Sequence, residues 1–188
     1  MSTEPHRVAM DEAIELEARA HDALLEGRDA EPLLRAAVEA WQRSWEAAPP
    51  RSFGRLIGMV KAAVLAGDAT DAARLIRAAI GPQGDSPPSW YALAIAALVV
   101  GDEPLAAHAA TGMREGSDAF VRTAEAIEAL VARDAERYAA AVQAIVADFE
   151  QRSDHLTGVA IADTALMLER LAEPRGLAAH PSSPLLPA

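Results

Sequence analysis

Two glycine–aspartate pairs, each directly after an apolar, alanine-rich segment, constrain the fold of this chain more than any other feature. They are Gly67-Asp68 in AVLAGDATDAARLI and Gly101-Asp102 in ALVVGDEPLAAHA, 34 residues apart. Glycine can adopt the positive φ that ends a helix, and an aspartate after it can accept hydrogen bonds from the free N–H groups of the next helix. The two pairs therefore predict corners between consecutive helices, not a functional site.

Apolar residues recur at the helical spacing i, i+4, i+7, i+11 along most of the chain. The stripes are Leu34, Val38, Trp41 and Trp45; Phe53, Ile57, Val60 and Val64; Phe120, Ala124, Ile127 and Val131; and Tyr138, Val142, Ile145 and Phe149. Alanine, the best helix former, makes up roughly a quarter of the residues, whereas the strand-favouring aromatic residues make up 4%. The sequence therefore predicts an all-α fold. Its central helix should be Trp90–Val100, which is apolar on nearly all sides.

Helix starts are marked by short polar residues that can cap free N–H groups. We expect four capping aspartates, Asp29, Asp68, Asp102 and Asp134, and further helix starts at Ser86, Ser117 and Thr157. The aspartates are 39, 34 and 32 residues apart. A period near 34 residues is typical of tetratricopeptide helix–turn–helix repeats, although here the spacing drifts.

These patterns predict a degenerate tetratricopeptide-like array of antiparallel helical hairpins, with about nine helices in one domain over residues 1–174. Residues 175–188 should form an extended, Pro- and Ser-rich tail, because proline breaks helices. Leu185 and Leu186 can either dock on the chain's own helices or bind a partner as an extended ligand. We favour docking on the chain's own helices.

Composition excludes several functional classes. The chain has no cysteine, which rules out disulfides and thiolate chemistry. Its net charge of −11 disfavours nucleic acid as a partner, because phosphate binding needs a basic surface. The apolar run Trp90–Val100 is far shorter than the roughly 20 residues that cross a bilayer. We therefore expect a cytoplasmic protein with no nucleic-acid or membrane partner, and its oligomeric state stays open.

One segment has the opposite charge. Residues 51–80 contain five basic and two acidic side chains. An ordinary solvated helix surface is one explanation of this charge bias. A distinct basic face is the other, and we test it with the prediction that Arg51, Arg55, Arg74 and Arg77 lie together on one face.

Chemical motifs are missing from the sequence. None of the five histidines has HExxH spacing, and no dinucleotide-binding, phosphate-binding or G-x-S-x-G motif occurs. Ser153-Asp154-His155 places a hydroxyl, a carboxylate and an imidazole together, but a catalytic triad depends on geometry and not on adjacency, so helix capping explains it better. We expect Trp41, Trp45 and Trp90 in the core, and His108 half-buried or exposed and not acting as a ligand. The sequence predicts no catalytic, cofactor-binding or metal-binding residue and no cofactor.

The second half of the chain shows a family resemblance. It reads ALAIAALVVGDEPLAAHAATGM, then VRTAEAIEALVARDAERYAAAVQAIVADFEQR, then TGVAIADTALMLERLAEPRGLAAHPSSPLLP. A helix ending at a Gly-Asp turn, a helix pair around an Arg-Asp corner, and an alanine/leucine-rich helix before RGL and a Pro-containing tail resemble the Imm49-like immunity proteins of bacterial polymorphic toxin systems. The resemblance covers roughly residues 90–187 and brings no catalytic motif. It implies an all-helical cytoplasmic protein that binds a toxin domain and neutralises it.

Three classes of function follow from these patterns. The first is a non-catalytic immunity protein, whose acidic charge would steer a basic toxin domain toward it. The second is a tetratricopeptide-like adaptor or assembly factor that binds a peptide or protein partner. The third and least favoured is an enzyme, which would need a pocket that gathers a buried histidine and carboxylates with shifted pKa values.

Overall fold

The fold is a chain of packed helices, seen in the computed structural model, which describes residues 4–187. Within that range there is no strand and there are nine α-helices, which confirms the all-α prediction. They are α1 (Pro5–Leu25), α2 (Glu31–Ala47), α3 (Gly54–Leu65), α4 (Thr70–Ile80), α5 (Pro87–Val100), α6 (Glu103–Met113), α7 (Asp118–Val131), α8 (Ala135–Glu150) and α9 (Asp163–Ala172). A 3-10 turn, η1 (Glu173–Arg175), follows α9.

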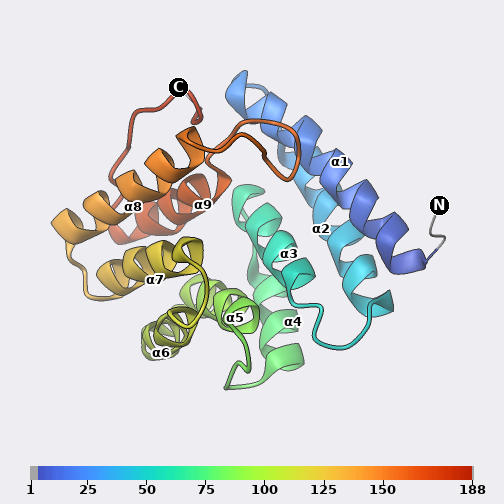
Figure 1. Cartoon of the computed structure of the whole chain (residues 1–188), viewed down its shortest axis with the longest axis horizontal. Helices are drawn as coiled ribbons and strands as arrows, with labels where there is room; N and C mark the ends of the chain where they lie inside the picture. The colour runs from blue at the N-terminus through green and yellow to red at the C-terminus, as the bar shows by residue number, and fades with distance from the viewer. Residues whose placement is uncertain (1–3, 188) are drawn as a thin grey trace.

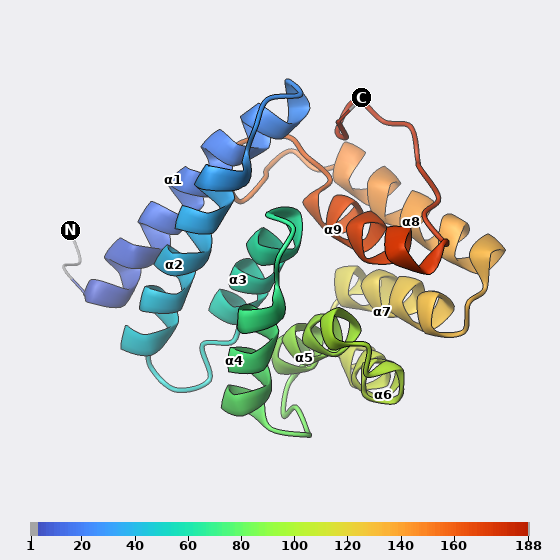
Figure 2. The same ribbon diagram turned by 180° about the vertical axis from the view of Figure 1, so that it is seen from behind.

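Most helices pack against the next one along the chain, and α9 returns to the middle of the array. The helix pairs α1–α2, α5–α6 and α7–α8 lie side by side around a central region in Figures 1 and 2. Because α9 contacts α3 as well as α7 and α8, the last helix joins the C-terminal helices to the first half of the array. No helix within residues 4–187 is both long enough and apolar enough to span a membrane.

The helix corners follow the sequence closely. Gly101 takes a left-handed conformation (φ 75°), and Asp102 Oδ1 accepts a hydrogen bond from the Leu105 N–H at 3.2 Å, as predicted. Asp134 caps α8 in the same way. The predicted positions of Asp29 and Asp68 are wrong by one residue, because each accepts from the N–H two residues later, and the caps of α2 and α4 are the alanines that follow them.

Of the other predicted helix starts, two are confirmed and one is wrong. Ser86 forms a capping box with Ser89, and Ser117 precedes the first residue of α7. Thr157 begins no helix, because residues 151–162 cross between α8 and α9 as a non-helical connection and the Thr157 hydroxyl is bonded to α1 instead. This connection passes beside α1 in Figure 1.

The core is dominated by α5, in which Ser89 to Leu98 are all buried. This confirms the prediction of a central helix. Trp41 and Trp90 are also buried, whereas Trp45 is half-buried. Many buried neighbours are alanines, which let the helices approach closely.

The C-terminal segment folds back onto the helices. Leu185 and Leu186 pack against the core, and the Ala162 N–H donates to the Leu185 carbonyl at 2.9 Å. The buried carboxylate of Glu169 also fixes this segment, accepting hydrogen bonds from the Tyr138 hydroxyl (3.0 Å) and the His180 N–H (2.6 Å). The preference for docking on the chain's own helices is confirmed.

Candidate functional site

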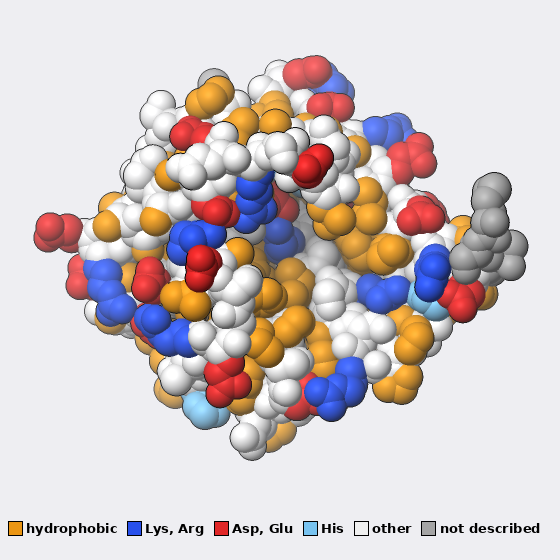
Figure 3. Space-filling view, viewed as in Figure 1, with side chains coloured by type: hydrophobic (Ala, Val, Ile, Leu, Met, Phe, Trp, Pro, Cys, Tyr) orange, Lys and Arg blue, Asp and Glu red, His pale blue; other side chains and the backbone are white. Residues whose placement is uncertain are grey.

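A cavity of about 280 Å³ lies at the centre of the helix array. Side chains from α1, α3, α5, α7, α8, the 151–162 connection and the start of α9 line it. Figure 3 shows the hollow on the face seen in Figure 1, with hydrophobic and basic side chains around it. Segments from both ends of the sequence therefore build one enclosure.

Two polar residues of α1 form the inner end of the cavity. Glu17 and His21 are four residues apart and so lie on the same side of the helix, and their exposed fractions are 6% and 3%. Burial raises the pKa of Glu17 from its ordinary 4.5 to about 7, against the opposing effects of Lys61 and of the Trp41 indole. Burial also lowers the pKa of His21. At neutral pH the imidazole is uncharged and the carboxyl is close to its titration midpoint.

An ion pair spans the middle of the cavity. Lys61 of α3 pairs with Asp163 in the first turn of α9, and Lys61 Nζ also donates to the Thr164 hydroxyl at 3.2 Å. Burial alone would raise the pKa of Asp163, but the ammonium of Lys61 outweighs it and leaves that pKa below its ordinary value. Likewise the pKa of Lys61 is raised, because Asp163 outweighs the effect of burial. Both groups are therefore charged at neutral pH.

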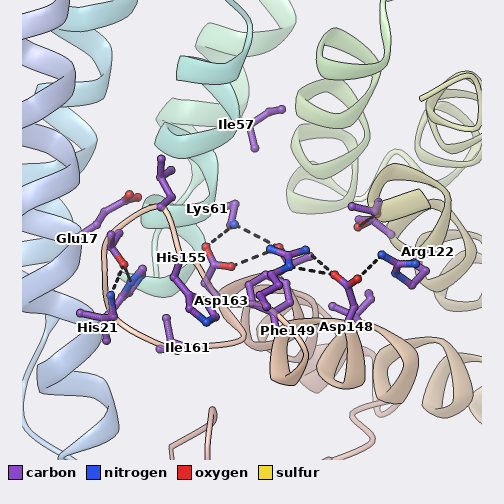
Figure 4. A pocket seen from close by; sticks show the side chains of 18 of the residues that line it. Glu17, His21, Ile57, Lys61, Arg122, Asp148, Phe149, His155, Ile161 and Asp163 are labelled. Carbon is purple, nitrogen blue, oxygen red and sulfur yellow. Dashed lines mark hydrogen bonds and ion pairs between the residues drawn. The ribbon is translucent and has the colours of Figure 1, made fainter. Parts of the chain in front are cut away.

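The outer end of the cavity carries a second ionic cluster. Asp148 of α8 accepts from Arg122 of α7 and from Arg152, in each case at 2.6 Å. The guanidinium of Arg152 also lies 3.8 Å above the ring centre of Phe149. In Figure 4 the Lys61–Asp163 pair lies between this cluster and the Glu17–His21 end. One carboxylate shared by two guanidinium groups leaves the outer end with an excess of one positive charge.

Apolar side chains separate the charged groups. They come from four parts of the chain: Ile57, Phe120, Ile145, Phe149, Val159 and Ile161. Tyr91 of the central helix also lines the cavity, and its ring meets that of Phe120 edge-on, with centroids 5.8 Å apart. A mostly apolar lining with a few placed polar groups is the usual character of a ligand-binding pocket.

The 151–162 connection is held over the cavity by one side-chain hydrogen bond to α1. The Thr157 hydroxyl and His21 Nδ1 are 3.1 Å apart. With His21 neutral, the hydroxyl can donate to the imidazole. Among residues 4–187, no carboxylate is hydrogen-bonded to this imidazole, so His21 and Thr157 do not form a hydroxyl–imidazole–carboxylate triad. The nearby carboxylate of Asp163 is paired with Lys61 instead. The contact therefore links the 151–162 connection to α1.

The Ser153-Asp154-His155 trio is not brought together as a site. Ser153 and Asp154 are exposed and bond to each other at 2.9 Å, while half-buried His155 lines the cavity. The expected capping role is wrong, because no helix begins there. His108 is exposed, as predicted, and its ring also meets that of Trp90 edge-on.

The predicted basic face is wrong. Arg51, Arg74 and Arg77 pair with Asp85, Asp71 and Asp102, which lie in different parts of the chain. Arg55 donates instead to the Ser44 hydroxyl at 2.8 Å. The positive charge of the segment is thus divided among separate ion pairs and does not form one face.

The polar residues of the cavity could not be recognised as a site in the sequence: Glu17, His21, Lys61, Tyr91 and Asp163. One signal was readable: Glu17 lies in register with Ala9, Ala13 and Ala20 on the buried side of α1, where a carboxylate is unusual. The cavity brings together a buried histidine and carboxylates with shifted pKa values. An enzyme would need such a pocket, and the sequence did not suggest one. No three His, Cys, Asp or Glu side chains within residues 4–187 are placed to hold a metal ion.

Comparison of the chain with known protein families, with curated proteins and with solved structures finds no match.

Proposed function

We propose that this protein is a non-catalytic binding protein, and specifically an immunity protein that neutralises a toxin domain by taking a segment of it into the central cavity. The observation that supports this most directly is the pairing of the cavity's charges. Lys61 is paired with Asp163, and Arg122 and Arg152 are paired with Asp148. These ion pairs join the helices that line the cavity. The apolar lining and the carboxyl of Glu17 remain available to contact a ligand.

The size of the cavity favours a local insertion. A volume of about 280 Å³ is slightly below the usual range of ligand pockets, roughly 300–1,000 Å³. It suits one or two side chains at the tip of a partner's loop, with the rest of the interface formed by the helices around the opening. A net charge of −11 would speed the approach of a basic toxin domain.

A tetratricopeptide-like adaptor is the second candidate, and the successive helix pairs α5–α6 and α7–α8 favour it. Such an adaptor holds an extended peptide along an open groove. Here α9 packs against α3 and the 151–162 connection is bonded to α1. These two features enclose the central region, and for this reason we prefer the insertion of a short segment.

Co-expression with the protein encoded by the adjacent gene tests the proposal. That protein should arrest bacterial growth when it is expressed alone, and the present protein should restore growth. Ala119→Phe, at a half-buried position that lines the cavity, should abolish the rescue. Ala107→Phe, at a half-buried helix position outside the cavity, is the matched control and should retain it. A harmless neighbour, or full rescue by Ala119→Phe, would overturn the proposal.

A further inference from the structure

Glu17 is the one carboxylate of the cavity with no partner among residues 4–187. Its side chain is more than nine-tenths buried and lines the cavity, yet neither oxygen forms a hydrogen bond or an ion pair there. The Trp41 indole N–H approaches closely enough to lower the pKa of Glu17, but it is buried without a hydrogen bond of ordinary geometry and carries no charge, so it does not neutralise the carboxylate. Figure 4 shows Glu17 reaching from α1 toward the interior. Buried carboxylates are rarely left in this state, because an unpaired buried charge is costly.

The cations near Glu17 are already engaged. Lys61 is bound by Asp163 and Thr164, and its single charge faces two carboxylates at this end of the cavity. His21 is kept neutral by burial, and the hydroxyl of Tyr91 stays protonated because burial raises its pKa. With Glu17 ionised, the inner end therefore carries an excess of one negative charge.

The remaining charged groups of the cavity lie on the side of Arg122 in Figure 4. There Asp148 is bonded to both Arg122 and Arg152. His155 lies between His21 and Phe149 in the same view (Figure 4), with 6.1 Å between the ring centres of His155 and Phe149. The Arg122 end carries the opposite excess, one positive charge. A ligand that matches both ends presents a cation deep in the cavity and an anion nearer the opening.

We propose that the inner end of the cavity binds an ammonium or guanidinium group on an apolar stem, namely a lysine or arginine side chain of the partner protein, with Glu17 as its counter-ion. This inference rests on the proposed function, because it names the part of the toxin domain that enters the cavity. The apolar walls, such as Ile57 and Val159, suit the methylene stem of such a side chain, while its charged end meets the carboxylate. A neutral or acidic side chain would leave Glu17 unpaired.

Binding of a cation beside Glu17 should depend on pH. A cation needs Glu17 as the carboxylate, and the pKa of Glu17 in the free protein is raised to about 7 by burial. Affinity should therefore rise between pH 6 and pH 8, where both lysine and arginine remain protonated. Asp163 and Lys61 do not titrate in this window, because the pKa of Asp163 is lowered and that of Lys61 is raised from their ordinary values.

The test uses the full chain and small probes, observed by NMR chemical-shift titration. The first pair of probes is n-pentylammonium and its neutral analogue n-pentanol. The second pair is N-acetyl-lysine methylamide and the same compound acetylated on its side chain. The ammonium probes should bind saturably at the cavity and at least tenfold more tightly than their neutral analogues. Equal binding within each pair, or no saturable binding at pH 8, would overturn the inference.

Two matched variants complete the test. Glu17→Gln should weaken ammonium binding at least tenfold and remove its increase between pH 6 and pH 8. Glu15→Gln removes an exposed carboxylate from the same helix and should leave binding unchanged. Unaltered binding by Glu17→Gln would contradict the role of Glu17.

The two proposals can fail separately. If Ala119→Phe abolishes rescue of growth but Glu17→Gln does not, the cavity binds the toxin domain without a buried cation. In that case the inference is wrong and the proposed function stands. If the ammonium probes bind through Glu17 but the neighbouring protein is not toxic, the cation site stands and the immunity function is wrong.

Discussion

Lys61 and Asp163 form an ion pair that joins α3, in the first half of the chain, to the first turn of α9 near its end. Their side chains are 16% and 20% exposed, so the pair is shielded from water without being fully dry. The hydroxyl of Thr164 accepts a second hydrogen bond from Lys61. The pair therefore joins the two halves of the chain and adds no net charge to the cavity.

Lys61→Met should destabilise the protein because it leaves Asp163 without a counter-ion. Breaking a fully buried pair costs about 3–5 kcal/mol, and with this degree of exposure we expect roughly 2 kcal/mol at pH 7. The pairing holds the pKa of Asp163 below its ordinary 3.8, so its stabilising contribution is present above about pH 4 and is lost as the pH falls further. Urea unfolding at pH 7 and pH 3 should show the penalty shrinking at the lower pH.

The double variant Lys61→Met/Asp163→Asn is the control for this prediction. It removes both charges together, so it should recover most of the stability lost in the single variant. A double variant no more stable than Lys61→Met would show that the packing of the lysine stem matters and the charge pairing does not.

Glu17→Gln should stabilise the protein at pH 8. A carboxyl whose pKa is raised on folding binds its proton more tightly in the native state. Its contribution is therefore complete below its unfolded pKa of 4.5 and is lost as the pH rises through about 7. The shift corresponds to roughly 3 kcal/mol at most. The wild-type protein should lose stability relative to the variant from pH 4.5 to pH 7.5, as measured by chemical unfolding.

Glu15→Gln, at an exposed position on the same helix, should show no such pH dependence relative to wild type. A gain in stability at Glu17 alone is the expected sign of a residue kept for binding at a cost in stability. If Glu17→Gln is instead less stable at pH 8, the carboxylate has a stabilising partner in the folded protein.

The helices could be predicted from the sequence because their signals are local. Gly101 and Asp102 end one helix and begin the next through contacts with residues only a few positions away. The errors at Asp29 and Asp68 have the same origin. An aspartate that bonds the N–H two residues later looks the same in sequence as one that caps the helix directly.

The cavity could not be predicted because its groups meet only in the folded chain. Lys61 was grouped with the arginines of a basic segment, yet its partner Asp163 arrives from α9. Thr157 carries the signal of a helix start, but its hydroxyl is used by His21 in α1. Glu17 alone gave a local hint, a carboxylate in an alanine stripe, and that hint does not reveal what the residue faces.

Removal of the two leucines near the C-terminus should lower the melting temperature. Leu185 and Leu186 are half-buried against the core, and truncating both to alanine should cost about 2 kcal/mol in all. For a domain of this size that corresponds to a decrease of roughly 4–8 °C. Val8→Ala, at an exposed position on α1, is the control and should leave the melting temperature unchanged. An unchanged value for the leucine variant would contradict docking.

Gly58→Ala should destabilise the protein although alanine is the better helix former. Gly58 of α3 lies against the indole of Trp41, and an added methyl carbon would be 2.5 Å from Trp41 Cε2. The gain in helix propensity is about 1 kcal/mol, whereas overpacking a tight contact costs roughly 1–3 kcal/mol. Since Trp41 is buried and cannot move outward freely, we expect a net loss measurable by thermal unfolding.

Gly54→Ala makes the same chemical change in the same helix without the obstacle. An added methyl carbon at Gly54 meets nothing within 4 Å, so this variant should be neutral or slightly more stable. The indole of Trp41 lies against Gly58 and also lowers the pKa of Glu17. Gly58→Ala should therefore change the pKa of Glu17 as well as the stability, which a carboxyl-carbon NMR titration can detect. A shift of that pKa in Gly54→Ala but not in Gly58→Ala would contradict the coupling through Trp41.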